Sequence, residues 1–503
     1  MSYFGSRMSI KSQNSRIIFG LKVKQLRLMN ESNTFEKLSK HTGMSVSYLN
    51  EIEKGKKYPK ADKIRFLAEA LDVSVEDLTS LELTGNLAPL GELLKSNFLS
   101  ELPLDMFGIE LSKVVSIIAN APLRVGAFIS TLVELARNYA MREENFYHGA
   151  MRAYQEMHYN YFEDIEDKVT EFVNTHQIPI NNSISGKSLA IILKKNYKYK
   201  IDESGLDAFP DLQRLRSVYL PREKKLLLNG AMTERQRTFQ YSKELAFNFL
   251  DLKSRTNTSS LMKAESFEQV LHHFKANYFA TTLLIPQESF IEDLQEFFKK
   301  EKWDGEAFLS LMRKYDASPE MLFARMTNVI PRFFGLKKIF FIRAVHDHEK
   351  NKYQIDKELH LDQVHHAHSN RLYEHYCRRW MSMSLLKDLS EIQAQGKYAD
   401  TMVGAQRSKY FGTKDEYLCL TLARTGSPTP DINFSVTIGI LVNDELQKAI
   451  SFWNDPSITI RQVNKTCERC PIDDCEERAH TATIIERRAE RKKLQDALKK
   501  VME

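Results

Sequence analysis

The sequence lacks any apolar run long enough to cross a membrane, because no stretch approaches about 18 uninterrupted apolar residues. Its N-terminus, Met-Ser-Tyr-Phe-Gly-Ser-Arg, also lacks the apolar core of a secretory signal peptide. Cysteine is scarce, with 5 in 503 residues. We therefore expect a cytoplasmic protein, in whose reducing surroundings the cysteines serve as metal ligands or spare thiols and not as disulfides.

A net positive charge is also missing from most of the chain. The formal net charge is +6, and residues 1–80 carry 14 Lys and Arg against 9 Asp and Glu, which leaves the other 423 residues nearly neutral. This asymmetry predicts a nucleic-acid partner for the N-terminal region and a different role for the rest. The length allows about three domains, and a composition of 42% hydrophobic and 27% charged residues is ordinary for a globular protein.

Residues 34–57 have the pattern of a helix-turn-helix. A first helix with Leu38 facing inward ends at Gly43, and a second begins at Ser45, whose hydroxyl is expected to cap it. A turn of about four residues with a glycine lets the second helix cross the first and present its N-terminal end outward. Such an exposed helix end is suited to the major groove of DNA.

The second helix supplies the expected DNA-binding surface. Val46, Leu49 and Ile52 are expected to face the first helix, and the remaining side chains to meet base edges and phosphates. Gly55 ends the helix, and the lysines on either side of it, Lys54, Lys56 and Lys57, are expected to lie along the DNA backbone. The predicted DNA-binding residues are Ser45, Val46, Ser47, Tyr48, Asn50, Lys54, Lys56 and Lys57.

Residues 19–81 resemble the xenobiotic-response-element type of helix-turn-helix domain, also called Cro/C1-type, over residues 20–27, 45–55 and 64–71. Members of that family usually carry a phosphate-contacting Gln where this chain has Phe35. The resemblance implies a double-stranded DNA operator as partner. We expect a homodimer or a higher homo-oligomer, because one such domain buries little DNA surface and paired half-sites multiply the contacts.

The sequence predicts a multidomain, mainly α-helical protein with a C-terminal α/β part. Apolar residues recur every three or four positions between 90 and 180, which indicates a helical linker that either pairs with its copy or packs within one chain. Strand patterns occur at residues 338–343, 416–424 and 433–442. The expected segments are a disordered leader (1–15), the helix-turn-helix (19–81), the linker (90–180), a middle domain (181–330), an α/β domain (331–483) and a C-terminal helix (484–503).

The middle domain resembles the IrrE/ImmA-like metallopeptidases, on the runs at residues 235–250 and 278–286. Those enzymes carry a His-Glu-x-x-His helix, whose imidazoles hold zinc beside a glutamate base. Here Lys243 and Phe247 occupy the histidine positions and only Glu244 remains. A lysine ammonium and a phenyl ring cannot replace imidazole, so we expect no peptidase or other enzymatic activity. The cavity that holds the metal and peptide in those enzymes either holds another ligand here or has closed to form part of the core.

A Cys-x2-Cys-x4-Cys motif spans residues 467–475. Two thiolates at that first spacing hold one metal, and the third completes a face of the site. Two choices of fourth ligand remain open, because His480 would complete a zinc site and Cys377 an iron–sulfur site. Cys419 lies in an apolar strand and is expected to be core.

The combination of these three parts resembles the short-chain fatty acyl-CoA regulator family, which includes the mycobacterial propionate regulator. Matching segments are residues 160–166, 237–240 and 279–286, Cys377 with Trp380, and residues 467–478. The resemblance implies that the α/β domain binds coenzyme A or a short-chain acyl-CoA. It also implies a [4Fe–4S] cluster, with the ligands Cys377, Cys467, Cys470 and Cys475.

This sequence departs from that family at one point, because the proline that usually follows the first cysteine is replaced by Arg378. Two other functions stay open beside the acyl-CoA regulator. One is a regulator with a Cys3His zinc site, and the other is an antitoxin-like DNA-binding protein whose body binds a protein partner.

Overall fold

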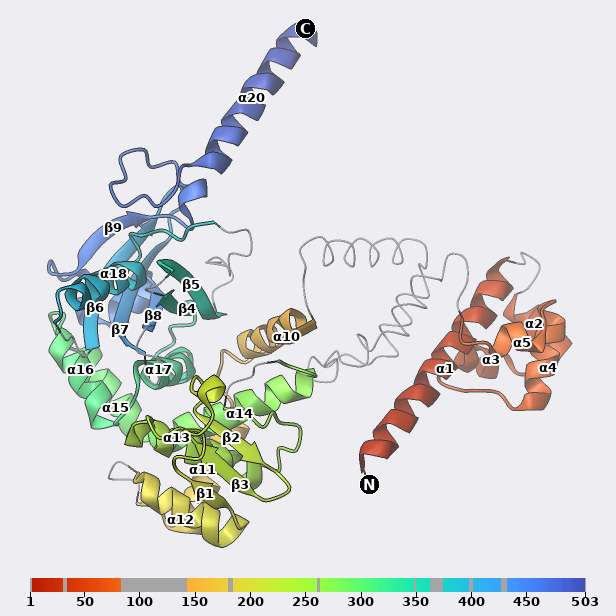
Figure 1. Cartoon of the computed structure of the whole chain (residues 1–503). Coiled ribbons are helices and arrows are strands. Elements are labelled where there is room, and N and C mark those ends of the chain that lie inside the picture. Colours follow the sequence, from red (N-terminus) through yellow and green to blue (C-terminus); the bar gives the residue numbers. More distant parts are fainter. Residues whose placement is uncertain are drawn as a thin grey trace. The chain divides into compact units, whose positions relative to one another are not determined.

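The computed structural model describes residues 2–29, 34–82, 143–179, 184–259, 263–347, 350–361, 374–397, 401–426 and 432–502. The chain forms two compact units (Figure 1). Unit 1 comprises Met1–Ala150 with Glu265–Phe267, and unit 2 comprises Met151–Ala264 with Glu268–Glu503. Much of the predicted linker at 90–180 lies outside the described residues. Its last part forms the helices α10 (Glu143–Met157) and α11 (Glu163–His176).

Unit 1 is helical. Its described helices are α1 (Ser2–Met29), α2 (Phe35–Thr42), α3 (Val46–Glu53), α4 (Ala61–Ala70) and α5 (Val75–Thr79). Residues 2–15 belong to α1, so the expectation of a disordered leader is wrong for them. The physical reason is that this stretch contains no proline, and its Ser, Lys and Gln residues can continue the helix whose later turns pack in the core.

The core of unit 1 is built where α1 meets α3. Gly20 lies against the end of α3, where an added Cβ would approach the carbonyl oxygen of Ile52 to 2.2 Å. A glycine is therefore required for this close crossing of the two helices. The buried side chains of this core are Phe19, Val23, Leu38, Met44, Leu49, Ile52, Ile64, Leu67, Ala68, Leu71 and Leu78.

The first part of unit 2 combines helices with a small sheet. After α11 come α12 (Gly186–Tyr197), β1 (Lys200–Asp202), β2 (Ser217–Leu220), β3 (Lys225–Leu228), α13 (Glu234–Phe249) and α14 (Phe267–Leu284). Strand β3 lies in the middle, parallel to β1 and antiparallel to β2. The capping box of Thr233 and Gln236 begins α13, whose buried face joins α12 and the sheet in one core.

The second part of unit 2 is built on a six-stranded sheet with strand order β5-β4-β8-β7-β6-β9. Neighbouring strands are antiparallel except β6 and β9, which are parallel. The strands are β4 (Ile339–Asp347), β5 (Lys352–His360), β6 (Thr401–Tyr410), β7 (Glu416–Thr425), β8 (Ile432–Leu441) and β9 (Thr459–Val463). The three predicted strand segments are therefore confirmed as β4, β7 and β8, and the α/β character of this part is confirmed.

The two faces of this sheet have different cores. Helices α15 (Gln287–Phe298), α16 (Gly305–Lys314), α17 (Pro319–Phe333) and α19 (Asp444–Ala449) contribute to the core on one face. Helix α18 (Met381–Ala394) covers the other face together with Tyr376, Cys377 and Trp380. The candidate cysteine site is thus placed on the α18 side of the sheet.

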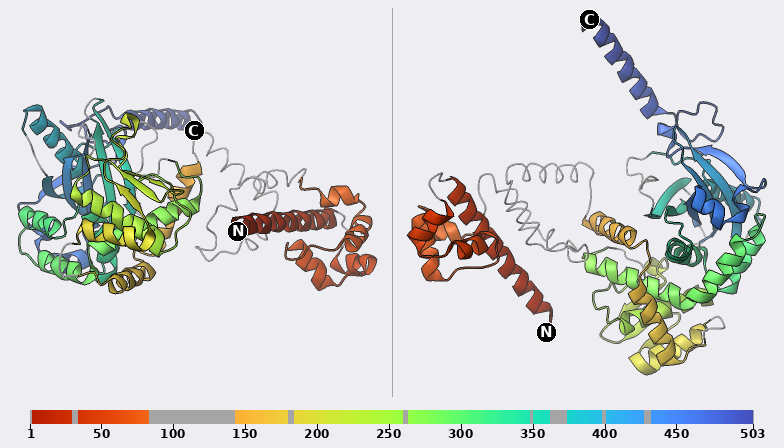
Figure 2. Two further views of the ribbon diagram at one scale, coloured as in Figure 1. Left: turned by 60° about the horizontal axis from the view of Figure 1, so that its bottom comes forward. Right: turned by 180° about the vertical axis from the view of Figure 1, so that it is seen from behind.

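The chain ends in α20 (Thr483–Met502), close to the predicted helix at 484–503, and none of its described residues is buried. Figures 1 and 2 show α20 as one straight helix. Among the described residues, no helix combines the length and apolar character that a membrane span requires.

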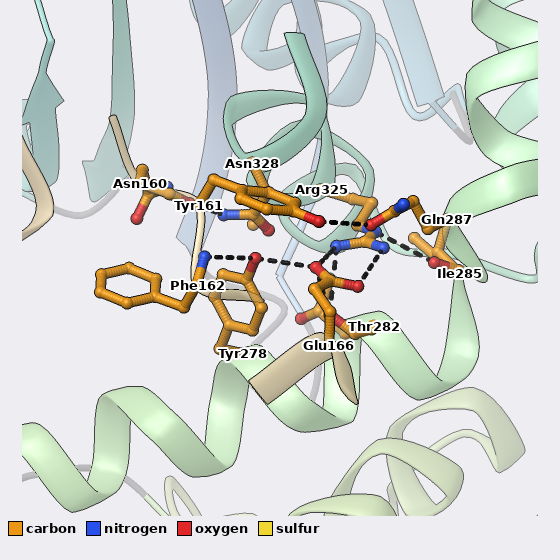
Figure 3. A network of polar contacts seen from close by, with 12 residues as sticks. Asn160, Tyr161, Phe162, Glu166, Tyr278, Thr282, Ile285, Gln287, Arg325 and Asn328 are labelled. Carbon is orange, nitrogen blue, oxygen red and sulfur yellow. Dashed lines mark hydrogen bonds and ion pairs between the residues drawn. The ribbon is translucent and has the colours of Figure 1, made fainter. Parts of the chain in front are cut away.

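A buried polar network joins the two parts of unit 2 (Figure 3). Arg325 of α17 donates from Nη2 to Glu166 of α11 at 3.0 Å and from Nε to the carbonyl oxygen of Ile285 at 3.0 Å. The hydroxyl of Tyr278 donates to Glu166 at 2.8 Å. Asn328 donates to the carbonyl oxygen of Asn160 at 2.8 Å. These bonds fix residues 160–166, one of the segments that carried the family resemblance, to α14 and α17.

Candidate functional sites

The helix-turn-helix has the predicted local geometry. Gly43 ends α2 with φ 66°, in the left-handed region that favours glycine. The hydroxyl of Ser45 accepts the backbone N–H of Tyr48 at 3.2 Å and so caps α3. Leu49 and Ile52 are fully buried, as expected. The N-terminal end of α3 is thereby fixed at the surface.

Val46 corrects one expectation. We expected it to face the first helix, but 40% of it is exposed. It is the first residue of α3, where the chain has only just entered the helix, so it lies beside the exposed Ser45 and Ser47. Val46 therefore belongs to the outer surface, where it was also predicted as a DNA-binding residue.

The other predicted DNA-binding side chains lie on or beside α3. Tyr48 and Asn50 are half-buried, and the Nζ of Lys63 lies 4.4 Å from the centre of the Tyr48 ring. Three exposed lysines directly follow α3 in the sequence, namely Lys54, Lys56 and Lys57. Such a group of half-buried polar side chains flanked by lysines can contact base edges and phosphates.

Phe35 has a structural role that the sequence did not reveal. The guanidinium of Arg27 lies 4.0 Å from the centre of the Phe35 ring. It donates two hydrogen bonds to the buried carboxylate of Glu53, at 2.6 and 2.9 Å, which raise the pKa of Arg27 above its ordinary value. Phe35 therefore covers an ion pair that ties α1 to α3. No local pattern links these residues.

The α13 position that corresponds to the glutamate base of the peptidases named above is occupied by an ion pair. Glu244 accepts hydrogen bonds from Arg255 at 2.7 Å on each carboxylate oxygen and one from Tyr199 at 3.0 Å. The guanidinium of Arg255 lies 3.9 Å from the centre of the Phe247 ring. Only 3% of Glu244 and 4% of Phe247 are exposed. Both carboxylate oxygens of Glu244 are thus occupied and shielded from solvent, whereas a general base needs a free oxygen to accept the proton of a metal-bound water.

Lys243 is buried beside a histidine. Its Nζ donates to the carbonyl oxygen of Ser259 at 2.9 Å and lies 3.2 Å from Nδ1 of His273. The pKa of Lys243 is lowered to about 7, chiefly by burial, with Glu244 opposing the shift and Arg255 adding to it. Burial also lowers the pKa of His273 to about 3. These contacts favour the closed alternative at this position, since protein groups fill it.

A backbone bridge brings the distant cysteine to the motif. The N–H of Cys377 donates to the carbonyl oxygen of Lys465 at 3.1 Å, and the N–H of Cys467 donates to that of His375 at 2.8 Å. Cys377, Cys467 and Cys470 are all buried. Burial raises the pKa of the Cys377 thiol to about 11, and the nearby Cys467 and Cys470 contribute to the rise. The fold therefore gathers these three thiols, although about 90 residues separate Cys377 from the motif.

Arg478 closes the cysteine loop. Its guanidinium donates to the carbonyl oxygens of Cys467 at 3.1 Å and Cys470 at 3.2 Å. Its backbone N–H donates to the carbonyl oxygen of Cys475 at 3.2 Å. The N–H of Ala479 lies 3.4 Å from the Cys467 sulfur. Backbone donors to sulfur are typical of metal-bound thiolates. Cys475 is half-buried on the same loop.

His480 has partners of its own. Its ring stacks on that of His375, with centroids 5.0 Å apart, and its Nδ1 lies 3.4 Å from Glu468. His375 contacts the same carboxylate through Nδ1 at 2.8 Å. The potential ligand atoms of these three residues lie within 4.8 Å of one another. Cys419, by contrast, is buried on β7 near Ser408, where burial raises its pKa to about 12. It lies in the core, as expected.

Comparison with known proteins identifies two domains. The model of the helix-turn-helix family matches residues 23–78, and that of the IrrE N-terminal-like domain matches residues 206–327. The control protein C.BamHI of Bacillus amyloliquefaciens is 33% identical over 75 residues, which are 15% of this chain and 93% of that protein. A solved transcriptional regulator from Mycobacterium tuberculosis aligns with 66% of this chain and 93% of its own, with a TM-score of 0.45 and 18% identity.

Proposed function

Since this chain belongs to the helix-turn-helix family through residues 23–78 and is a DNA-binding transcriptional regulator, we propose that it responds to an acyl-CoA. Coenzyme A or a short-chain acyl-CoA would bind the C-terminal part of unit 2. The four cysteines Cys377, Cys467, Cys470 and Cys475 would hold a [4Fe–4S] cluster. The regulator would bind its operator as a homodimer, each copy reading one half-site.

The observation that carries the cluster is the bridge between the segments around Tyr376 and Thr466. It brings a fourth cysteine beside a motif that supplies three. Arg378 adds a second observation, because its Nη1 is buried without a hydrogen-bond partner in the part of the chain that the structure describes. Its charge is coupled to Cys377 and Cys467. An anionic cluster held by thiolates would satisfy that donor, so the residues present fit the group.

The cluster is tested by native mass spectrometry of the full chain purified without oxygen. We expect an added mass of four irons and four sulfides, lost when Cys377 is changed to Ser. Cys419→Ser is the matched control, because Cys419 is an equally buried cysteine outside the proposed set. A single zinc that survives Cys377→Ser would instead favour a Cys3His site and contradict the cluster. The same spectrum counts the subunits.

The effector proposal depends on a thermodynamic condition. An acyl-CoA changes transcription only if it binds the DNA-competent and DNA-incompetent states of the dimer with different affinities. The closed centre around Glu244 leaves the peptidase position without room for this role. We therefore expect acetyl-CoA or propionyl-CoA to shift operator affinity when titrated into the full-length protein. An operator affinity that stays constant at saturating acyl-CoA would contradict the proposal.

A further inference from the structure

Two histidines and a glutamate meet beside the cysteines without belonging to the proposed cluster. We call His375, Glu468 and His480 the histidine–glutamate site. His375 lies in the segment before α18, Glu468 lies in the cysteine loop at residues 467–475, and His480 follows that loop. The backbone bridge between Tyr376 and Thr466 brings the first segment to the second. The site therefore depends on the fold and not on one local motif.

The carboxylate of Glu468 is held in place by the backbone. The N–H of His375 donates to Oε2 of Glu468 at 2.9 Å and lies 3.1 Å from Oε1. Only 7% of the Glu468 side chain is exposed. A carboxylate that is already oriented by backbone donors loses little further freedom when it binds an ion. Glu468 is thus preorganised as a ligand.

Both imidazoles present a nitrogen to the same carboxylate oxygen. The Nδ1 of His375 lies 2.8 Å from Oε1 of Glu468, and the Nδ1 of His480 lies 3.4 Å from it. The two rings are stacked 4° from parallel, with centroids 5.0 Å apart. The Nδ1 of His480 also lies 3.3 Å from the carbonyl oxygen of Thr481. Two nitrogens and at least one oxygen therefore converge on one place.

The spacing of these atoms suits a single small cation. Ligand atoms in tetrahedral zinc sites lie about 2.0–2.2 Å from the ion and therefore about 3.4 Å from one another. The distances of 2.8 and 3.4 Å from Oε1 of Glu468 are close to that value. The potential ligand atoms of all three residues lie within 4.8 Å of one another. Small rotations of the two rings would thus place one ion between the three ligands.

The donor set and its exposure indicate the kind of ion. Two imidazoles and a carboxylate suit zinc and other divalent transition metals, whereas calcium and magnesium prefer oxygen ligands alone. Of the His375 side chain 42% is exposed, and of the His480 side chain 45%. An ion can therefore enter from solvent, and water can complete its coordination.

We propose that His375, Glu468 and His480 bind one divalent transition-metal ion such as zinc, at a site separate from the four cysteines. This inference goes beyond the acyl-CoA regulator and uses none of the proposed cluster ligands. It gives His480 a metal site of its own, in place of the fourth position in a Cys3His site. Because α20 begins three residues after His480, the ion would tie the approach to α20 to the segment that carries His375.

The test adds zinc to the full-length protein purified without oxygen. Native mass spectrometry counts the bound ions, and X-ray absorption at the zinc edge identifies the neighbours of zinc without interference from iron. We expect one zinc with nitrogen and oxygen neighbours at about 2.0–2.2 Å and no sulfur at about 2.3 Å. A wild-type protein that binds no zinc would overturn the proposal.

Variants assign the ligands. His480→Ala and Glu468→Gln should each weaken zinc binding about tenfold or more, because each removes a ligand. His41→Ala is the matched control, since His41 is an exposed histidine on α2, and it should leave zinc binding unchanged. His480→Ala is the decisive variant, because its side chain is half exposed, whereas Glu468 is buried in the cysteine loop.

The outcomes separate this site from the cluster. Zinc with only nitrogen and oxygen neighbours, in a protein that contains no iron, supports the histidine–glutamate site and overturns the cluster. Four irons together with zinc binding that His480→Ala does not weaken overturns the site and leaves the cluster standing. A single zinc with sulfur neighbours, lost in both Cys475→Ser and His480→Ala, is a Cys3His site and overturns both proposals.

Discussion

Arg325 and Glu166 form a buried ion pair between α17 and α11, with 0% of the arginine side chain and 9% of the glutamate side chain exposed (Figure 3). Burial alone would lower the pKa of Arg325, but Glu166 outweighs it and raises that pKa. Tyr278 and Thr282 supply further hydrogen bonds to the carboxylate. Every charge here has a partner, so the pair holds two parts of unit 2 in one arrangement.

We predict that Arg325→Met lowers the free energy of unfolding of unit 2 by about 3–5 kcal/mol, because it leaves Glu166 charged and unpaired in the core. Changing Glu166 to Gln as well should restore part of that loss. Urea unfolding followed by tryptophan fluorescence measures the change, since Trp303, Trp380 and Trp453 all lie in unit 2. The control is Arg332→Met, an exposed position on the same helix. Equal effects at the two arginines would contradict the prediction.

A second prediction concerns pH and Lys243. Its pKa falls from 10.5 to about 7 on folding, chiefly through burial. Between those pH values the unfolded chain holds the proton and the folded chain does not, so the free energy of unfolding rises with pH. The buried Lys243 therefore lowers the free energy of unfolding most below pH 7, where its ammonium is charged. Replacing Lys243 by Met should raise Tm relative to wild type more at pH 6 than at pH 9.5.

Thermal unfolding at the two pH values measures this difference. Lys253→Met is a suitable control, because the Lys253 side chain is 79% exposed and its replacement should have the same small effect at both values. A Lys243→Met effect that does not change with pH would show that the ammonium is not destabilised by burial.

The helix-turn-helix was predictable because its signals are local. Gly43 and Ser45 each specify a backbone geometry through their own chemistry, and the spacing of Leu49 and Ile52 specifies the buried face. Val46 was misplaced because periodicity alone does not reveal that the first residue of a helix can remain outside. What the sequence predicted here depends on neighbours within one or two turns.

The large sheet was predicted only where strands are apolar. β4, β7 and β8 are rich in apolar and β-branched residues, most of which are buried by the cores on the two faces. β5 and β9 form the edges of the sheet and contain exposed polar and charged residues between their apolar ones. β6 contains the buried polar residue Gln406. Those three strands lack an apolar run and were missed.

The candidate sites combine residues that no local pattern connects. The link between Cys377 and Cys467 depends on a backbone bridge between segments about 90 residues apart. The partners of Lys243 and Glu244 come from a loop and a second helix. Sequence motifs could suggest the cysteines, but not these partners.

The third prediction separates base reading from backbone contact. Asn50 is half-buried on α3, and Lys56 is exposed beyond its end. Asn50→Ala should therefore weaken binding to the cognate operator more than to random DNA, because an amide can read a base edge. Lys56→Ala should weaken both and reduce the slope of log affinity against log salt by about one. Lys195→Ala, exposed on α12, is the control.

Fluorescence anisotropy with labelled duplexes at several salt concentrations measures both effects. Tyr48→Ala should likewise act most on the cognate operator, but the contact of Tyr48 with Lys63 makes a stability check necessary for that variant. Comparable losses on cognate and random DNA for Asn50→Ala would remove Asn50 from the predicted base readers.

The last prediction rests on the proposed iron–sulfur cluster and concerns Arg378, which replaces the proline usual in the acyl-CoA regulator family that the sequence resembles. Its guanidinium lies 3.7 Å from the centre of the Tyr353 ring, and its charge is coupled to Cys377 and Cys467. A cation beside a cluster favours the reduced form, which carries one more negative charge. Arg378→Ala should therefore make the reduction potential more negative, as read by an anaerobic spectroscopic redox titration.

Arg379→Ala provides the comparison, because the adjacent Arg379 already has Glu477 as a partner at 3.9 Å. It removes the same charge one residue away, from a guanidinium that a carboxylate already balances. We expect a clearly smaller change in potential for Arg379→Ala than for Arg378→Ala. If both variants keep the wild-type potential with the cluster fully loaded, the Nη1 of Arg378, which has no hydrogen-bond partner among the described residues, is not directed at the cluster.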